Sequence, residues 1–193
     1  MLKRLYEAVI GMAGHRNAVP GLAVVSFAES SFFPIPPDVL LIPMVLAQRS
    51  RAWFYAAIST VASVLGGVLG YAIGFYLFDS VGQDLVNFYG YGDQFTKFQG
   101  HYLEWGIWIV IFFGVTPFPY KVITIASGVV AMDPMGFILA SAASRGVRFY
   151  MECGLLWYFG DPIRDFIERR LGLVVLGTCL LLVGGFVVLK WVL

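Results

Sequence analysis

The sequence predicts an all-α integral membrane protein built as an inverted repeat, each half a re-entrant helical hairpin followed by a transmembrane helix. Of its 193 residues, 59% are hydrophobic and only 13% are charged, whereas about 25% of the residues in soluble globular domains are charged. Proline clusters interrupt two apolar regions, and these regions align with each other at a constant offset of 83 residues. We therefore expect a single membrane domain over residues 1–193, with no soluble domain.

Residues 1–17 are expected to form an uncleaved amphipathic helix on the membrane surface. Lys3 and Arg4 precede apolar residues as in a signal peptide, but Glu7 interrupts the apolar stretch. Apolar residues recur at helical spacing, which would turn Lys3 and Arg4 toward lipid head groups.

The first repeat is expected over residues 18–78. Its hairpin has legs at 19–33 and 39–47, and the helix over 53–78 is long enough to cross roughly 30 Å of hydrocarbon. Backbone that is not helical at membrane depth must be buried in protein or face a wet cavity. The predicted hairpin breaks are Pro34, Pro36 and Pro37 in this repeat, and Pro117 and Pro119 in the second.

An acidic external connection over residues 79–105 leads to the second repeat, expected over 106–160. The hairpin legs at 106–116 and 122–132 are each roughly 16 Å long as helix, about half the thickness of a bilayer core. The helix that follows carries three charged residues, which are costly in lipid unless they face protein or water. We therefore expect this helix to line an internal site.

Residues 161–193 are expected to form a cytoplasmic connection and a last transmembrane helix. Eight Lys and Arg residues fall on one side of the predicted topology and only Lys97 and Lys190 on the other. The positive-inside rule therefore places the N terminus in the cytoplasm. Only the lengths of the legs favour re-entrant hairpins over hairpins that cross the bilayer twice.

Six ionisable residues remain at membrane depth, three acidic and three basic. Because guanidinium and ammonium groups bind phosphate, we interpret Lys121, Arg145 and Arg148 as candidates for holding an anionic substrate. Carboxylic acids within membrane segments often carry protons, which makes Glu29 and Asp38 candidates for proton coupling.

Structural roles are the alternatives for these residues. Arg148 and Glu152 are four residues apart and can form an ion pair along one helix. Asp38 could cap the second leg of its hairpin, although Lys121 at the matching position cannot accept the same hydrogen bonds. Arg145 has no comparable local partner, so either an acid of the first hairpin reaches it or it awaits an anionic ligand.

Other classes of function find no support in the sequence. It contains no nucleotide-binding loop, serine elbow or HExxH motif. Neither its two histidines nor Cys153 and Cys179 are spaced as metal ligands, and a net charge of +1 gives no reason to expect a nucleic acid partner. We expect a protein that is not an enzyme and that needs no cofactor or metal ion.

The chain resembles the DedA family of bacterial membrane proteins, which is related to the VTT or SNARE-associated Golgi proteins. The resemblance covers nearly the whole chain and rests on four features. They are the acidic FAES segment, the FPIPPD turn, the proline-broken second hairpin ending in a basic residue, and the later helix containing Gly, Arg and Trp. The short first turn is most similar to the YqaA-type branch.

The resemblance implies inverted re-entrant hairpins, a location in the bacterial inner membrane, and proton-dependent translocation of undecaprenyl phosphate or phospholipids. The two hairpin acids of the family match Glu29 and Asp38, and the final arginine of its second-hairpin motif matches Lys121. The earlier arginine of that motif falls on Val115, so Arg145 or Arg148 would have to supply the missing cation.

The expected function is therefore proton-coupled movement of an anionic lipid, a polyprenyl phosphate or a phospholipid, between the leaflets. The partners would be phosphate-bearing membrane lipids and protons, and the sequence leaves a homo-oligomer open. Two alternatives are a non-transporting membrane scaffold or assembly factor, and a proton-driven exporter of small solutes.

Overall fold

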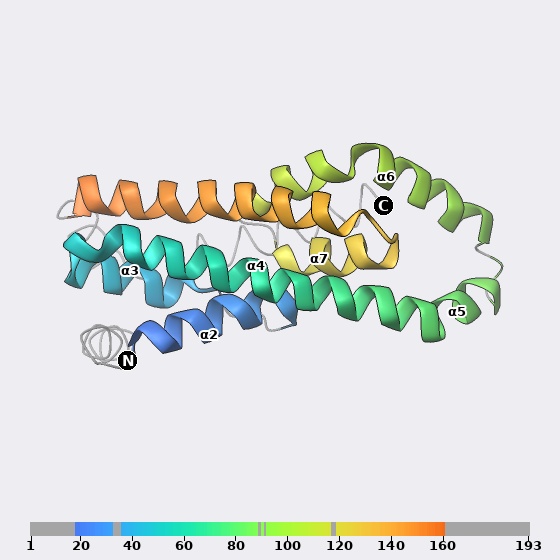
Figure 1. Ribbon diagram of the computed structural model, residues 1–193, viewed down its shortest axis with the longest axis horizontal. Coiled ribbons are helices and arrows are strands. Elements are labelled where there is room, and N and C mark those ends of the chain that lie inside the picture. Colours follow the sequence, from blue (N-terminus) through green and yellow to red (C-terminus); the bar gives the residue numbers. More distant parts are fainter. Residues whose placement is uncertain (1–17, 33–35, 89, 91, 117–118, 161–193) are drawn as a thin grey trace, which may run out of the picture.

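The computed structural model describes residues 18–32, 36–88, 90, 92–116 and 119–160. Within these ranges the chain forms helices and turns and no strands (Figure 1), which confirms the predicted all-α class. The expected helix over 1–17, the segment over 161–193, and the hairpin prolines Pro34 and Pro117 lie outside the described residues.

A long central helix, α4, organises the molecule. It runs from Ala52 to Leu77, and the stretch Arg49–Ser80 is the one helix among the described residues that is long and apolar enough to cross a membrane. No charged residue occurs between Arg51 and Asp79, so the roughly 20 residues needed to cross a bilayer core can all lie in hydrocarbon. The predicted helix over 53–78 is confirmed, with the length and composition of a membrane span.

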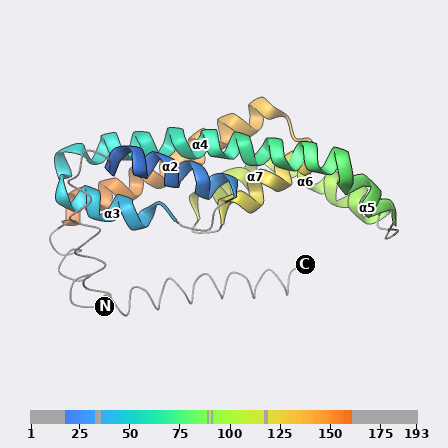
Figure 2. The ribbon, with the colours of Figure 1, turned by 90° about the horizontal axis from the view of Figure 1, so that it is seen from below.

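Two short helices of the first hairpin pack against α4 (Figures 1 and 2). They are α2, Ala18–Ser31, and α3, Asp38–Ala47. Their 14 and 10 residues correspond to roughly 21 Å and 15 Å of helix, which is less than the roughly 30 Å of a bilayer core. A single turn of 3₁₀ helix, Arg49–Arg51, connects α3 with α4.

The segment after α4 differs from the expected external connection because most of it is helical. A π-helical turn, Phe78–Gly82, continues into α5, Gln83–Phe88. The next helix, α6, then runs from Gly92 to Val115, so it begins well before the expected leg at 106. No proline occurs between Pro43 and Pro117, so nothing in the backbone chemistry interrupts a helix there.

The second hairpin continues from α6 into α7, Tyr120–Val129, with Pro119 at the N-cap position. A long helix then covers residues 134–160. This last described helix lies beside α4 along much of its length and appears in orange in Figure 1.

Glycines on one face of α4 allow α2 and α7 to approach it closely. A Cβ atom at Gly66 would overlap the carbonyl of Phe27 in α2, and one at Gly74 would overlap the carbonyl of Ile125 in α7. Small residues at such positions let helix backbones pack closely within a membrane. Gly66 and Gly74 are therefore packing residues of α4.

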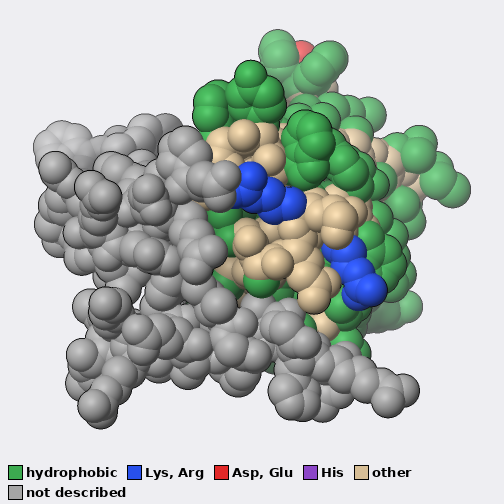
Figure 3. All heavy atoms as spheres, turned by 90° about the vertical axis from the view of Figure 1, so that its left-hand side faces the viewer, with side chains coloured by type: hydrophobic (Ala, Val, Ile, Leu, Met, Phe, Trp, Pro, Cys, Tyr) green, Lys and Arg blue, Asp and Glu red, His purple; other side chains and the backbone are tan. Residues whose placement is uncertain are grey.

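Large hydrophobic side chains cover the outer surface of the helices. Val61, Leu65, Trp108 and Phe112 are each at least 57% exposed, as suits side chains that face lipid. Figure 3 views the end of the molecule that carries the connection between α3 and α4, where basic side chains lie among hydrophobic ones. Such a mixture is typical of the membrane–water interface.

Candidate functional site

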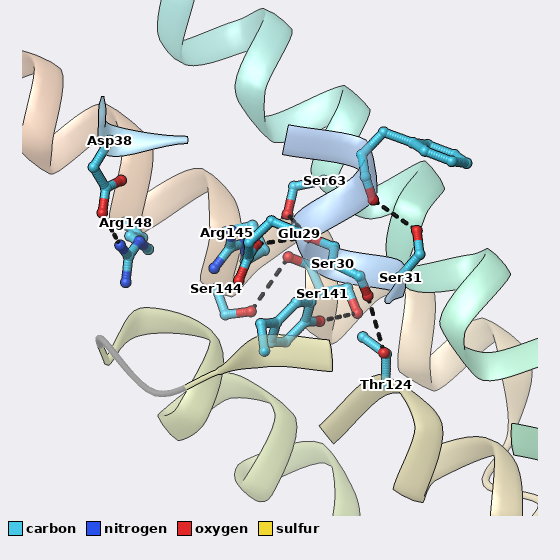
Figure 4. A network of polar contacts seen from close by, with 12 residues as sticks. Glu29, Ser30, Ser31, Asp38, Ser63, Thr124, Ser141, Ser144, Arg145 and Arg148 are labelled. Atoms are coloured by element: carbon cyan, nitrogen blue, oxygen red, sulfur yellow. Dashed lines mark hydrogen bonds and ion pairs between the residues drawn. The ribbon is translucent and has the colours of Figure 1, made fainter. Parts of the chain in front are cut away.

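Arg145, on the last described helix, is the centre of a buried polar network (Figure 4). Its side chain is almost fully enclosed, and Nη2 donates a hydrogen bond of 2.9 Å to Oε2 of Glu29 in α2. Nε donates to Oγ of Ser63 in α4 at 2.6 Å. The guanidinium carbon lies 4.8 Å from the ring centroid of Tyr120 in α7 and 4.7 Å from that of Phe149. One arginine therefore connects its own helix with α2, α4 and α7.

Small hydroxyl side chains extend this network between the two hairpins. Ser30 Oγ donates to Glu29 Oε2 at 3.1 Å and shares a hydrogen bond of 2.6 Å with Ser63 Oγ. Thr124 Oγ1 donates to the carbonyl of Ser30 at 3.1 Å. All three hydroxyl residues are fully buried, so α2 of the first hairpin and α7 of the second are joined directly.

Arg148 makes a second ion pair almost one helical turn after Arg145. Its Nη2 donates to Oδ2 of Asp38 in α3 at 2.8 Å, and its Nη1 donates to the carbonyl of Thr116 at 2.9 Å, just after α6. The side chains of Arg148 and Asp38 are 15% and 27% exposed. Arg148 therefore joins the breaks of the two hairpins, and it is more accessible than Arg145.

The expected local ion pair between Arg148 and Glu152 differs from the pairing observed. Among the described residues, the salt bridge of Arg148 is formed with Asp38, because α3 brings that carboxylate to the guanidinium from another part of the chain. Asp38 makes no capping hydrogen bond at the start of α3, so the capping alternative does not describe it. The side chain of Glu152 interacts electrostatically with both Asp38 and Arg148.

Lys121 is the predicted site residue that the structure leaves apart from this network. It is the second residue of α7 and is partly buried. Its ammonium forms no salt bridge with any residue that the structure describes. Four of the five predicted substrate and proton residues are therefore brought together in two ion pairs, and Lys121 follows the break of the second hairpin.

Sequence reasoning missed the hydroxyl groups that complete the site. Ser63 and Tyr120 contact Arg145 directly, and Tyr120 also donates a hydrogen bond to Ser141. The signal was present, because Ser59 and Ser63 are four residues apart in an otherwise apolar helix and so share one helix face.

The two arginines and two acids of the site form ion pairs, and either partner of a pair can in principle be replaced by another charged group. An anionic group could take the place of Asp38 on Arg148, whose Nε is buried without a hydrogen-bond partner among the described residues. Within the same residues, no group of three or more His, Cys, Asp or Glu is placed to hold a metal ion. The site therefore presents guanidinium donors and carboxyl groups, the side chains that in general bind anions and protons.

Comparison with known proteins identifies the family. Residues 35–158 match the VTT domain. The chain is 36% identical over 186 residues to an uncharacterized protein of Haemophilus influenzae, covering 96% of each. A Histophilus somni relative is 35% identical over 186 residues, covering 96% of this chain and 97% of the relative.

An archaeal protein shares the similarity over a shorter stretch. It is an uncharacterized protein of Methanocaldococcus jannaschii, 31% identical over 134 residues, which cover 68% of this chain and 79% of the relative. No solved structure matches the chain. Because the VTT domain covers more than half of the sequence, and the Haemophilus relative matches it nearly end to end, the chain belongs to the VTT-domain family of DedA-type membrane proteins.

Proposed function

We propose that this protein is a transporter that moves an anionic, phosphate-bearing lipid between the leaflets of the bacterial inner membrane and is coupled to protons. The observation that carries the proposal is the pair of salt bridges, Arg145–Glu29 and Arg148–Asp38, which join the first hairpin to the last described helix within an apolar helical protein. Ionisable groups at membrane depth are expensive to bury and typically mark a substrate or proton pathway.

Arg148 is the group best suited to receive a phosphate. It is accessible in part, and its Nε is a buried donor without a partner among the described residues. A phosphate can engage the planar guanidinium through two parallel hydrogen bonds, so a phosphate replacing Asp38 would leave the arginine paired. Lys121 would supply a second cation from α7, and the enclosed Arg145 would hold Glu29 in place and add positive charge.

The proposed architecture is an inverted repeat of re-entrant hairpins with the N terminus in the cytoplasm. The shortness of α2, α3 and α7 supports it, because none of these helices reaches across a bilayer core. Two hairpins that enter from opposite faces and meet at Arg145 would place an ion-paired site near the middle of the membrane, where inverted-repeat transporters bind their substrates.

Leaflet exchange of fluorescent lipids tests the proposal. Purified protein in vesicles is compared with Arg148→Lys, Lys121→Ala and the control Lys97→Ala, which changes an exposed lysine of α6. We expect exchange of anionic but not zwitterionic lipid, faster with a pH gradient. Exchange should fall about tenfold or more in Arg148→Lys, because loss of one charge-assisted hydrogen bond costs about 1.5 kcal/mol or more, and stay unchanged in Lys97→Ala.

Two results would overturn the proposal. Folded wild-type protein without lipid exchange, beside an active control transporter, would favour a membrane scaffold whose ion pairs only lock the hairpins together. Proton flux that depends on an added solute, in vesicles where lipid distribution does not change, would favour an exporter of small solutes.

A further inference from the structure

A second carboxyl group lies beside the Arg148–Asp38 ion pair. Glu152 follows Arg148 by four residues, so the two side chains share one face of the last described helix. The Glu152 carboxyl also interacts electrostatically with the Asp38 carboxyl, which Arg148 holds in its ion pair. Asp38 meets Arg148 through Oδ2, while its Oδ1 is buried and has no hydrogen-bond partner among the described residues.

Two carboxylates that lie beside the same arginine repel each other and cannot both remain ionised in a weakly polar environment. A single shared proton changes the contact, because the protonated carboxyl then donates a hydrogen bond to the ionised one. The same proton would provide Asp38 Oδ1 with the partner that it lacks, since a buried oxygen without a partner is otherwise costly.

The charges around Asp38 and Glu152 also indicate one bound proton. Three carboxyl groups, from Glu29, Asp38 and Glu152, face two guanidinium groups, from Arg145 and Arg148. With every carboxyl ionised, the cluster would carry one net negative charge, which is unfavourable where water is scarce. One bound proton makes the cluster neutral.

Glu29 is a poorer place for that proton. Its Oε2 accepts hydrogen bonds from both Arg145 and Ser30, as an ionised carboxylate does. The Asp38 carboxyl has one cationic donor, and among the described residues Glu152 forms no salt bridge. The neighbouring thiol of Cys153 also faces these two acids and, as a neutral group, does not change the charge count.

We infer that Asp38 and Glu152 together bind one proton, and that this carboxyl pair is the proton-binding site of the protein. Glu152 then has a role that its spacing from Arg148 did not predict. The coupling of this proton to transport rests on the proposed function, whereas the shared proton itself does not.

The pair would couple the proton to an anion through Arg148. A proton on Asp38 weakens the hold of that carboxyl on Arg148, since the attraction between opposite charges is lost. The guanidinium can then accept a phosphate in exchange. The bound phosphate adds one negative charge, so the carboxyl pair takes up a second proton from water and the cluster stays neutral. When the phosphate leaves, that second proton returns to water, Asp38 pairs with Arg148 again, and one proton remains on Glu152.

Infrared difference spectroscopy tests the shared proton without any transport. Purified full-length protein in lipid nanodiscs, treated with EDTA, is titrated from acidic to alkaline pH, and the C=O stretch of protonated carboxyl groups is followed. The variants are Glu152→Gln, Glu152→Asp, Glu29→Gln and the control Glu104→Gln, an exposed acid of α6.

We expect wild-type protein to show a protonated-carboxyl band that disappears at alkaline pH and shifts when glutamate is labelled with ¹³C. Glu152→Gln should lose the band, whereas Glu29→Gln and Glu104→Gln keep it. Glu152→Asp, which shortens the side chain but retains the acid, should move the midpoint of the titration and serves if the glutamine variant does not fold. A band that survives in Glu152→Gln, or that is lost in Glu29→Gln, overturns the assignment.

Lipid exchange by the same variants separates this inference from the proposed function. Glu152→Gln should exchange anionic lipid at a rate that no longer responds to a pH gradient, while Glu104→Gln responds as wild type does. If the infrared band behaves as expected but wild-type protein moves no lipid, the proton site stands and the proposed function fails. A Glu152→Gln protein that still responds fully to the gradient rejects the coupling role of the pair.

Discussion

Two arginines three residues apart have different surroundings. Arg145 is 1% exposed and lies between two aromatic rings, while Arg148 is partly accessible and has one nitrogen without a partner among the described residues. A guanidinium enclosed in this way has little freedom to exchange partners. On the proposed function, Arg145 therefore holds the helices together and Arg148 binds the phosphate.

Replacement of Arg145 should destabilise the protein strongly. Arg145→Met leaves Glu29 buried without its cation, and breaking a buried ion pair from one side costs about 3–5 kcal/mol. Thermal and denaturant unfolding in detergent would measure this loss. The double variant Glu29→Gln/Arg145→Met should recover a large part of it, because no unpaired charge remains. A double variant as unstable as Arg145→Met would contradict the argument.

At the scale of helices, the contacts of α4 with α2 and α7 depend on individual glycines. Gly66→Ala and Gly74→Ala each place a methyl group against the backbone of a neighbouring helix. We expect each to destabilise the protein by about 1–3 kcal/mol, as overpacking typically does. The change would be followed as a fall in the melting temperature of purified protein.

Gly67→Ala is a matched control in the same helix. A Cβ there would meet side-chain atoms of Thr124, Tyr120 and Phe137 at 3.4–3.7 Å, which is ordinary van der Waals contact. Alanine is also the better helix former by about 1 kcal/mol, so stability should be unchanged or raised. Equal losses at Gly66 and Gly67 would mean that close packing of α2 on α4 does not govern stability.

The helices that the sequence predicted well are those with strong local signals. Unbroken apolar character determined α4, and prolines determined where α3 and α7 begin. The beginning of α6 was missed because polar residues were interpreted as a connection, although a helix with no proline or capping signal can extend into the polar phase. An apolar pattern predicts which residues face lipid, but it does not predict the residue at which a helix begins.

The residues of the site could be predicted from the sequence, but their ion pairs could not. Charge at membrane depth singled out Glu29, Asp38, Arg145 and Arg148, since such charges need partners. Which acid meets which arginine depends on how α2 and α3 pack against the last described helix. Spacing along one helix favoured Glu152 as the partner of Arg148, because spacing can indicate contacts within one helix but not contacts between helices.

For the whole molecule, the predicted topology places the two ends of α4 on opposite sides of the membrane. Ser50→Cys, in the turn before α4, and Thr96→Cys, in α6, are both exposed positions. In a background without Cys153 and Cys179, an impermeant maleimide should label Ser50→Cys in inside-out vesicles and Thr96→Cys in right-side-out ones. Labelling of both from the same face would contradict the topology.

The two ion pairs also constrain the order of events during synthesis. Glu29 and Arg145 are 116 residues apart, and Asp38 and Arg148 are 110 residues apart. At about 5–20 residues per second, the acids of the first hairpin leave the ribosome roughly ten seconds before their partners exist. During that time they must remain near water, be protonated or be shielded by the insertion machinery. With its acids ionised and unshielded, the first hairpin can therefore settle at its final depth only after the last described helix has been made, which makes its insertion a late event of biogenesis.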